Sequence, residues 1–189
     1  MGIVGQVTRA VFLDRDGVMN RAVVREGRPY PPATLADLEI IPGAPAAARR
    51  LHEAGFLLIG MTNQPDVARG KTPRTTVEAL NSTVAEAIGL DEMLTCFHDD
   101  QDDCDCRKPR PGQFFAMRDQ RGVDLSQSFM VGDRWRDVAA AQNAGCRSVF
   151  IDYGYDEPFK AGPADFTCSS LAEAADWILS TSSSDFKQE

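Results

Sequence analysis

Residues 10–18 read Ala10-Val11-Phe12-Leu13-Asp14-Arg15-Asp16-Gly17-Val18, an apolar run that passes directly into two acidic residues separated by an arginine. A short apolar run bounded by polar residues is typical of a buried strand. The carboxylates of Asp14 and Asp16 are costly at the end of such a strand unless a positive charge lies near them. The stretch therefore predicts a buried strand that ends at a cation-binding site.

Similar apolar runs recur along the chain and alternate with segments of helical periodicity. Further strands are expected at residues 57–61, 129–131 and 148–151, with weaker candidates at 93–97 and 165–167. Helices are expected at residues 44–53, 75–88, 112–121, 135–144 and 171–179. The alternation predicts a three-layer, Rossmann-like α/β fold with a mostly parallel sheet and helices on both faces. Ligands of such sheets bind beyond the carboxyl ends of the strands.

The length and composition are those of one ordinary globular domain. The chain has 189 residues, of which 43% are apolar and 25% charged. We expect a single domain over residues 1–180 and a flexible polar tail at 181–189. About 45 residues separate the polar segments that follow successive strands, enough for a strand–helix crossover but not for an inserted lid domain. Little or no cap domain is therefore expected.

Charge and hydropathy exclude several classes of partner. The 28 acidic and 20 basic side chains leave a net charge of −8, so no extended basic surface for nucleic acid is expected. The sequence has no apolar run of the roughly 18 residues that a transmembrane helix needs, and residues 1–9 lack the profile of a secretory signal. These features favour a cytoplasmic protein that binds neither nucleic acid nor membranes. We also expect a monomer, although the charge does not decide the oligomeric state.

The two carboxylates after the first strand suit phosphoryl chemistry. Mg²⁺ prefers a few carboxylate oxygens together with waters and substrate phosphate oxygens. With a phosphate held there, one carboxylate can attack phosphorus, and the other can protonate the leaving group and then activate water. A solvated turn and a fragment of a calcium loop are the alternatives, although Met19 and Asn20 do not supply the further acidic residues of a calcium loop.

Three more polar segments follow apolar runs or precede a helix. Thr62 ends a predicted strand, where its hydroxyl can bind phosphate oxygens, unless the segment is only a turn. Lys108 and its neighbour Arg107 can neutralise and clamp phosphate, and a solvated basic pair is the alternative. Asp133 ends another buried strand and is the natural third ligand for Mg²⁺. Asp137 reaches either the metal or the start of the next helix.

A cysteine-rich loop at residues 96–106 predicts a second metal site. Three thiols and one imidazole make the closed tetrahedral ligand set of a structural zinc ion, here Cys96, His98, Cys104 and Cys106. A reduced surface loop and a redox pair are the alternatives. Four aspartates of the same loop are expected to form a solvated rim: Asp99, Asp100, Asp102 and Asp103. The remaining thiols are expected to be small buried apolar groups: Cys146 and Cys168.

The four polar segments, in this order, resemble the motifs of the haloacid dehalogenase superfamily of Mg²⁺-dependent phosphotransferases over residues 11–151. By this resemblance Asp14 is the nucleophile, and Asp16 is the general acid and base and also offers its backbone carbonyl to the metal. Thr62 is then the phosphate-binding hydroxyl, Lys108 the charge-neutralising group and Asp133 a metal ligand.

The zinc loop narrows the resemblance to two families. Residues 62–70 and 108–112 resemble the D-glycero-D-manno-heptose 1,7-bisphosphate 7-phosphatase family, whereas residues 132–134 resemble the histidinol-phosphate phosphatase family. The first family implies a small phosphorylated sugar as substrate and a place in nucleotide-activated heptose synthesis. A phosphatase for histidinol phosphate or another small sugar phosphate is the alternative, and a catalytically silent, zinc-stabilised binding module is the non-enzyme alternative.

Substrate contacts are expected from side chains near the predicted strand ends. The set expected to bind substrate or its phosphate comprises Arg15, Thr62, Asn63, Gln64, Arg107, Lys108 and Arg134. Residues 21–32 depart from the shorter loop of the typical bisphosphatase. Arg25 and Arg28 in this segment are candidates for a second phosphate, although a proline-stiffened surface loop is favoured.

Overall fold

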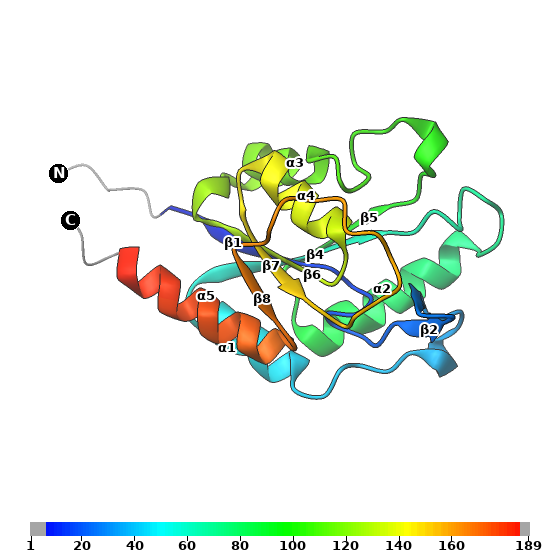
Figure 1. Cartoon of the computed structure of the whole chain (residues 1–189), viewed down its shortest axis with the longest axis horizontal. Coiled ribbons are helices and arrows are strands. Elements are labelled where there is room, and N and C mark those ends of the chain that lie inside the picture. The colour runs from blue at the N-terminus through cyan, green and yellow to red at the C-terminus, as the bar shows by residue number, and fades with distance from the viewer. Residues whose placement is uncertain (1–6, 186–189) are drawn as a thin grey trace.

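The computed structural model describes residues 7–185, which form a six-stranded parallel sheet in the order β5-β4-β1-β6-β7-β8 (Figure 1). The strands are β1 (Arg9–Leu13), β4 (Phe56–Asn63), β5 (Glu92–Cys96), β6 (Phe129–Gly132), β7 (Arg147–Ile151) and β8 (Phe166–Cys168). β1 lies inside the sheet because its last four residues are apolar and can be buried on both faces. The six predicted strands and their parallel arrangement are confirmed.

Helices cover both faces of the sheet. They are α1 (Ala44–Glu53), α2 (Arg74–Ile88), α3 (Gly112–Arg121), α4 (Trp135–Ala144) and α5 (Leu171–Asp185). Side chains alternate along β1, so Val11 and Leu13 join one core with α1, α2 and α5, while Ala10 and Phe12 join the other with α3 and α4. Figure 1 shows α3 and α4 on one side of the sheet and α1 and α5 on the other. No helix within residues 7–185 is long and apolar enough to cross a membrane.

The last helix is longer than expected. It runs to Asp185, so the start of the tail predicted from residue 181 is helical, and residues 186–189 lie outside the described part of the chain. Hydroxyl groups at its end donate to carbonyls one turn back, as Thr181 does to Trp177 at 2.7 Å and Ser182 to Ile178 at 2.8 Å. These bonds let serine and threonine continue the helix where their polarity suggested a tail.

A small antiparallel hairpin replaces the surface loop expected at residues 21–32. It pairs β2 (Val23–Arg25) with β3 (Arg28–Tyr30) between β1 and α1. Glu26 and Gly27 both have positive φ angles, 50° and 74°, as a two-residue hairpin turn requires. Three short 3₁₀ helices complete the described structure: η1 (Leu35–Asp37), η2 (Asp100–Asp102) and η3 (Leu125–Gln127). Among the elements of residues 7–185, this hairpin is the one that most resembles a small cap domain.

Candidate active site

The carboxyl ends of β1, β4 and β6 open into one pocket because these strands are neighbours in parallel register. Leu13 pairs with Gly60 on one side and with Val131 on the other, so the residues after each strand meet at one edge. The pocket is lined by Asp14, Asp16, Pro29, Tyr30, Pro31, Thr62, Asn63, Lys108, Asp133, Arg134, Arg136 and Asp137. Seven of the predicted site residues are among them. Gln64 and Arg107 instead line an adjoining groove.

Lys108 is the buried cation at the centre of this pocket. Its Nζ lies 2.7 Å from an oxygen of Asp14 and 2.6 Å from one of Asp137, and it donates to the carbonyl of Met61 at 2.7 Å. Burial alone lowers the pKa of a lysine, but the carboxylates of Asp137 and Asp14 outweigh it and raise the pKa of Lys108. Lys108 therefore stays charged and holds the two carboxylates together.

Of the two roles considered for Asp137, the structure shows the one at the start of the next helix, and it adds a contact with Lys108. One oxygen contacts Lys108, and the other accepts the backbone N–H of Arg134 at 3.1 Å, which caps the first turn of α4. The side chain can approach the end of β6 because residue 132 is glycine. A Cβ atom at Gly132 would lie 2.1 Å from the Cβ of Asp137.

Three buried carboxylates lie close together, and the single charge of Lys108 is too little to balance them. One oxygen each of Asp14, Asp133 and Asp137 lie within 4.8 Å of one another. Both carboxylate oxygens of Asp133 are buried and have no hydrogen-bond partner among the described residues. Burial, together with the charges of Asp14 and Asp137, raises the pKa of Asp133 well above its ordinary value. A cation that takes carboxylate oxygens fits this site, because it would supply the partner that the Asp133 oxygens need.

Asp14 shows the same shortage of positive charge. Burial raises its pKa from 3.8 to about 7, although Lys108 acts in the opposite direction. Asp14 also lies at the end of the central strand, where its backbone N–H donates to the carbonyl of Val131 at 2.9 Å. The side chain is therefore fixed in place and directed into the pocket that it lines.

Two predicted substrate ligands, Asn63 and Gln64, also support other site residues. The Asn63 amide donates to the carbonyl of Lys108 at 3.0 Å and accepts its N–H at 3.1 Å, so its side chain is occupied in holding the Lys108 backbone. The Gln64 amide nitrogen donates to Asp16 at 3.0 Å and to Thr62 at 2.9 Å. Motif spacing places both residues at the site but does not show which way their amides point.

The predicted contact between Arg15 and substrate is corrected. The Arg15 side chain is fully buried and lines neither the pocket nor the adjoining groove. Its guanidinium forms a fork with both oxygens of Asp16, at 3.2 and 2.9 Å. Arg15 is thus directed into the protein, whereas Asp14 and Asp16 on either side of it line the pocket.

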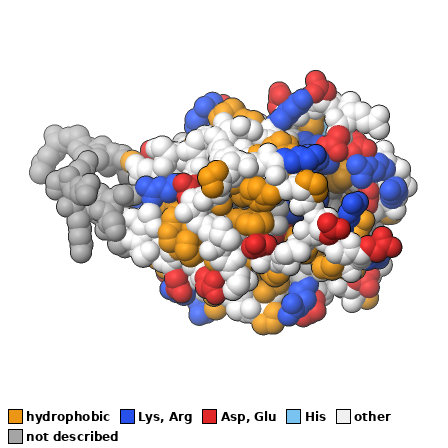
Figure 2. Space-filling view, viewed as in Figure 1, with side chains coloured by type: hydrophobic (Ala, Val, Ile, Leu, Met, Phe, Trp, Pro, Cys, Tyr) orange, Lys and Arg blue, Asp and Glu red, His pale blue; other side chains and the backbone are white. Residues whose placement is uncertain are grey.

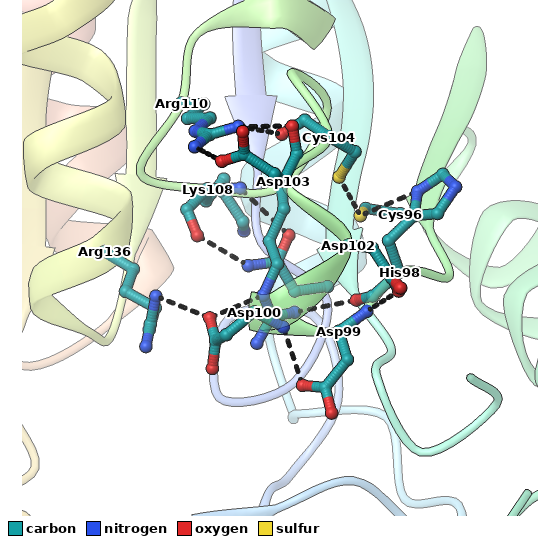
Figure 3. Close-up of polar contacts among 12 residues, drawn as sticks. Cys96, His98, Asp99, Asp100, Asp102, Asp103, Cys104, Lys108, Arg110 and Arg136 are labelled. Carbon is teal, nitrogen blue, oxygen red and sulfur yellow. Dashed lines mark hydrogen bonds and ion pairs between the residues drawn. The ribbon is translucent and has the colours of Figure 1, made fainter. Parts of the chain in front are cut away.

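Arginines surround the pocket mouth. Arg134 lines the pocket as predicted and pairs with Glu157, with 2.8 Å between Arg134 Nε and a Glu157 oxygen. Arg136 also lines the pocket and was missed. Its position was detectable, because it lies about one helical turn after Asp133. Arg136 lies 3.4 Å from a carboxylate oxygen of Asp100 (Figure 3), and Arg107 lies 2.9 Å from the same oxygen.

The hairpin contributes residues that the sequence did not identify. Pro29, Tyr30 and Pro31 line the pocket. Of the two arginines considered for a second phosphate, Arg28 lines the adjoining groove, whereas the guanidinium of Arg25 lies 5.8 Å from the centre of the Tyr30 ring. The structure thus places only Arg28 beside the candidate site.

The four predicted zinc ligands lie together in the loop that precedes Lys108. Cys96 Sγ lies 3.7 Å from both Cys104 Sγ and His98 Nδ1, and Cys106 Sγ lies 3.5 Å from Cys104 Sγ and 3.3 Å from His98 Nδ1. Ligands about 2.0–2.3 Å from one tetrahedral zinc ion would be about 3.3–3.8 Å apart. The geometry therefore fits such an ion, and Figure 3 shows Cys96, His98 and Cys104 facing one another.

Three of the four loop aspartates are exposed, as expected for a solvated rim: Asp100, Asp102 and Asp103. Asp99 is the exception. Asp99 is buried and forms two hydrogen bonds with Arg69, at 2.5 and 2.7 Å. These bonds lower the pKa of Asp99 to about 2. Asp102 accepts the backbone N–H of Asp99 at 2.7 Å, and Asp103 pairs with Arg110. The aspartates therefore fix the loop through specific partners.

Comparison with known proteins places the chain among phosphatases of similar length. A family model described as HAD-hyrolase-like matches residues 105–174. The D-glycero-beta-D-manno-heptose-1,7-bisphosphate 7-phosphatase of Escherichia coli O6:H1 is 35% identical over 178 residues, which cover 87% of this chain and 90% of the relative. The D-glycero-D-manno-heptose-1,7-bisphosphate 7-phosphatase of Thermosynechococcus vestitus is 33% identical over 191 residues, covering 89% and 94%.

A solved structure agrees with these relatives. The D,D-heptose 1,7-bisphosphate phosphatase from B. bronchiseptica, solved in complex with magnesium and phosphate, superposes with a TM-score of 0.74 at 29% identity. The superposition covers 92% of this chain and 99% of that chain. The fold and the cluster of carboxylates around a buried lysine are thus those of a haloacid dehalogenase-like phosphatase. Within that class, the chain belongs to the family of heptose-bisphosphate 7-phosphatases.

Proposed function

We propose that this chain removes the 7-phosphate of D-glycero-D-manno-heptose 1,7-bisphosphate in a Mg²⁺-dependent hydrolysis, as its relatives' names describe for them. The observation that carries the proposal is the buried cluster of Asp14, Asp133 and Asp137, in which both Asp133 oxygens have no partner among the described residues. Asp14, Asp133 and the Asp16 carbonyl would hold Mg²⁺. The ion would supply positive charge to the phosphate oxygens when bound.

The residues of the chain then divide the chemistry. Asp14 attacks phosphorus to form an aspartyl-phosphate, and Asp16 gives a proton to the oxygen that leaves. Asp16 then takes a proton from the water that attacks the aspartyl-phosphate, which frees Asp14. Thr62 and Lys108, which line the same pocket as Asp14, bind the phosphoryl oxygens.

A bisphosphate fits the charge around the pocket. The adjoining groove is lined by six basic residues, Arg28, Arg69, Lys71, Arg107, Arg134 and Arg136, and by four acidic ones, Asp66, Asp100, Asp156 and Glu157. This local excess of basic groups contrasts with the chain's net charge of −8. Figure 2 shows acidic and basic side chains gathered toward the end of the molecule that carries the hairpin in Figure 1. We assign substrate contacts here to Arg107 and Arg134, and add Arg136.

Zn²⁺ is proposed for the cysteine-rich loop. The support is the spacing of the ligand atoms of Cys96, His98, Cys104 and Cys106, which matches the edges of a tetrahedral site. The ion would be structural, since the four protein ligands leave no open position. We further propose that the enzyme acts in the cytoplasm as a monomer on a small phosphorylated sugar, a reducing setting that suits its free thiols.

The test is phosphate release by the purified protein with and without Mg²⁺. The substrates are heptose 1,7-bisphosphate, histidinol phosphate and simple sugar phosphates, with Asp14→Asn as the matched inactive variant. A marked preference for the bisphosphate that Asp14→Asn abolishes is the expected result. A preference for histidinol phosphate would support the alternative substrate instead. Release that persists in Asp14→Asn would contradict the assigned nucleophile.

A further inference from the structure

Arg15 is a buried charge for which the proposed reaction gives no direct role. Its side chain is the largest of the fully buried side chains in the described part of the molecule. A buried guanidinium is unfavourable unless its donors are paired. Two of them meet the oxygens of Asp16, and Nη1 donates to the Asn81 amide oxygen at 2.7 Å. Each of the three guanidinium nitrogens therefore has a partner inside the protein.

These contacts continue into a row that reaches the sheet edge. Asn81 lies on α2 and is itself buried. Its amide nitrogen donates to the Thr95 hydroxyl at 2.8 Å, on the edge strand β5. The row thus runs from Asp16 through Arg15 and Asn81 to Thr95. The row anchors the Asp16 carboxylate, on the loop after β1, to α2 and β5, whose positions are fixed by packing.

The Asp16 carboxylate is held in one orientation as a result. Besides Arg15, it accepts hydrogen bonds from Asn20 at 3.0 Å and from Gln64 at 3.0 Å. Each oxygen therefore has two donors, one of them from Arg15. When the reacting group replaces the Asn20 or the Gln64 donor, one position opens for the proton while the fork with Arg15 keeps the carboxylate in its orientation. A group that transfers protons must lie within hydrogen-bond reach of the reacting oxygen, so its orientation governs its efficiency.

We propose that Arg15, supported by Asn81 and Thr95, is a positioning residue that sets Asp16 for both proton transfers of the reaction. The proposal rests on the roles given above to Asp14 and Asp16. In the first transfer the phosphorus–oxygen bond to the sugar breaks as the sugar oxygen takes the Asp16 proton. In the second, water forms a bond to phosphorus, gives its proton to Asp16, and releases Asp14.

The two transfers are separable with p-nitrophenyl phosphate. Its nitrophenolate is stable at neutral pH and leaves without a proton, so the first step does not need Asp16. The second step, hydrolysis of the aspartyl-phosphate, still does. In Arg15→Met we expect the first turnover to stay fast and later turnovers to slow by about 100-fold, which gives a burst of one nitrophenolate per enzyme. With a sugar phosphate, the same variant should be slow from the first turnover.

The control variants distinguish positioning from folding. Asn81→Ala and Thr95→Val keep the Arg15–Asp16 pair and should give smaller bursts and smaller losses in kcat. Ser128→Ala removes a buried hydroxyl that accepts the N–H of Ala10 at 3.0 Å, far from the pocket, and should give no burst. Equal losses on both substrates without a burst in a folded Arg15→Met would overturn the proposal. So would a steady-state rate equal to that of the wild type.

The same assay detects failure of the underlying mechanism separately. Asp14→Asn should release no nitrophenolate at all, and a persisting burst would refute the aspartyl-phosphate itself. Asp16→Asn should reproduce the Arg15→Met pattern more strongly. If Asp16→Asn shows no burst while Asp14→Asn is inactive, Asp16 is not the proton-transfer group, and the role given to Arg15 fails with it. The choice of sugar does not affect these outcomes.

Discussion

Asp133 is accommodated because the residue facing it has no side chain. A Cβ atom at Gly17 would lie 1.9 Å from a carboxylate oxygen of Asp133. Gly17 also has a φ angle of +88°, which residues other than glycine adopt only with strain. The loop after β1 can therefore turn sharply and still let the third carboxylate approach Asp14.

Replacement of Gly17 by alanine should cost both stability and activity. We expect Gly17→Ala to lower the unfolding free energy by about 1–2 kcal/mol from the backbone conformation alone, and to abolish phosphate release because Asp133 is displaced. Gly55→Ala is the matched control, since Gly55 has a φ of +87° but nothing within 4 Å of its added Cβ. Thermal unfolding and phosphate release on both variants check the prediction. Full activity in Gly17→Ala would show that the close approach is unimportant.

For single residues, the sequence predicts where a residue lies in the fold better than which way its side chain points. Spacing correctly brought Asp14, Thr62, Lys108 and Asp133 to one edge of the sheet, because parallel strands end together. It did not show that the Arg15 side chain turns inward, since a loop residue between two pocket residues has no periodicity to orient it. Direction depends on packing partners distant in sequence, such as Asn81.

Among the elements, the cysteine-rich loop holds two site residues in place. The last of its proposed zinc ligands, Cys106, directly precedes Arg107 and Lys108. Removal of the metal should therefore disturb the site as well as the loop. We expect Cys104→Ser to lose zinc and to lower phosphate release by about 10–100-fold.

Cysteines outside the loop provide the matched control. Cys146 is buried away from the other thiols, and burial raises its pKa to about 12, consistent with the predicted small apolar role. Cys146→Ala should keep both zinc and activity. Metal analysis of the two purified variants, alongside their phosphate release, gives the comparison. Zinc content that is equal in Cys104→Ser and the wild type would contradict the assigned ligand set.

The hairpin makes a second element-scale prediction. Tyr30 lines the pocket and is 42% exposed, so its ring contributes little to the core. We expect Tyr30→Ala to raise KM for the preferred substrate by several-fold to about 10-fold, the scale of one lost contact of about 1 kcal/mol, with kcat unchanged. Leu35→Ala, at another exposed apolar residue that does not line the pocket, should leave KM unchanged. A KM unaffected by Tyr30→Ala would exclude the hairpin from substrate binding.

Elements were predictable in proportion to their burial. The buried strands and the helices have clear apolar periodicity, so their limits were found to within about two residues, apart from the end of α5. The hairpin strands are three residues each, mostly exposed, and β3 contains Pro29, so neither alternation nor composition identified them. Its turn, Glu26-Gly27, lacks the Asn-Gly or Asp-Gly pair that usually marks such hairpins.

The stability of the whole molecule should depend on the protonation of Asp14. In the metal-free protein its pKa is about 7, against 3.8 ordinarily, so folding favours the protonated acid. The stabilisation from Asp14 is fully present below about pH 4 and is lost as pH rises through about 7. Relative to Asp14→Asn, whose side chain does not titrate, metal-free wild type should lose thermal stability over this range. A difference that does not change with pH would contradict the raised pKa.

Magnesium should reverse this loss. A cation bound between the carboxylates favours their ionised forms, so its affinity should rise as pH increases toward 7. At a concentration about 100 times its Kd, a ligand that binds only the folded state adds about 2.7 kcal/mol. The rise in Tm on adding Mg²⁺ should therefore be larger at pH 7.5 than at pH 5, and small in Asp14→Asn at both. Equal shifts at the two pH values would argue against a carboxylate site.

The position of β1 in the middle of the sheet also sets the order of events during synthesis. Ala10 on β1 is bonded to Ser128, 118 positions further along the chain. Closing so long a loop costs entropy before any contact compensates it. The reacting aspartates are thus made among the first residues but acquire Asp133 only when the last third of the chain is available. A nascent chain that ends before β6 lacks Asp133 and Asp137, so the carboxylate cluster cannot form until β6 and the first turn of α4 have been made.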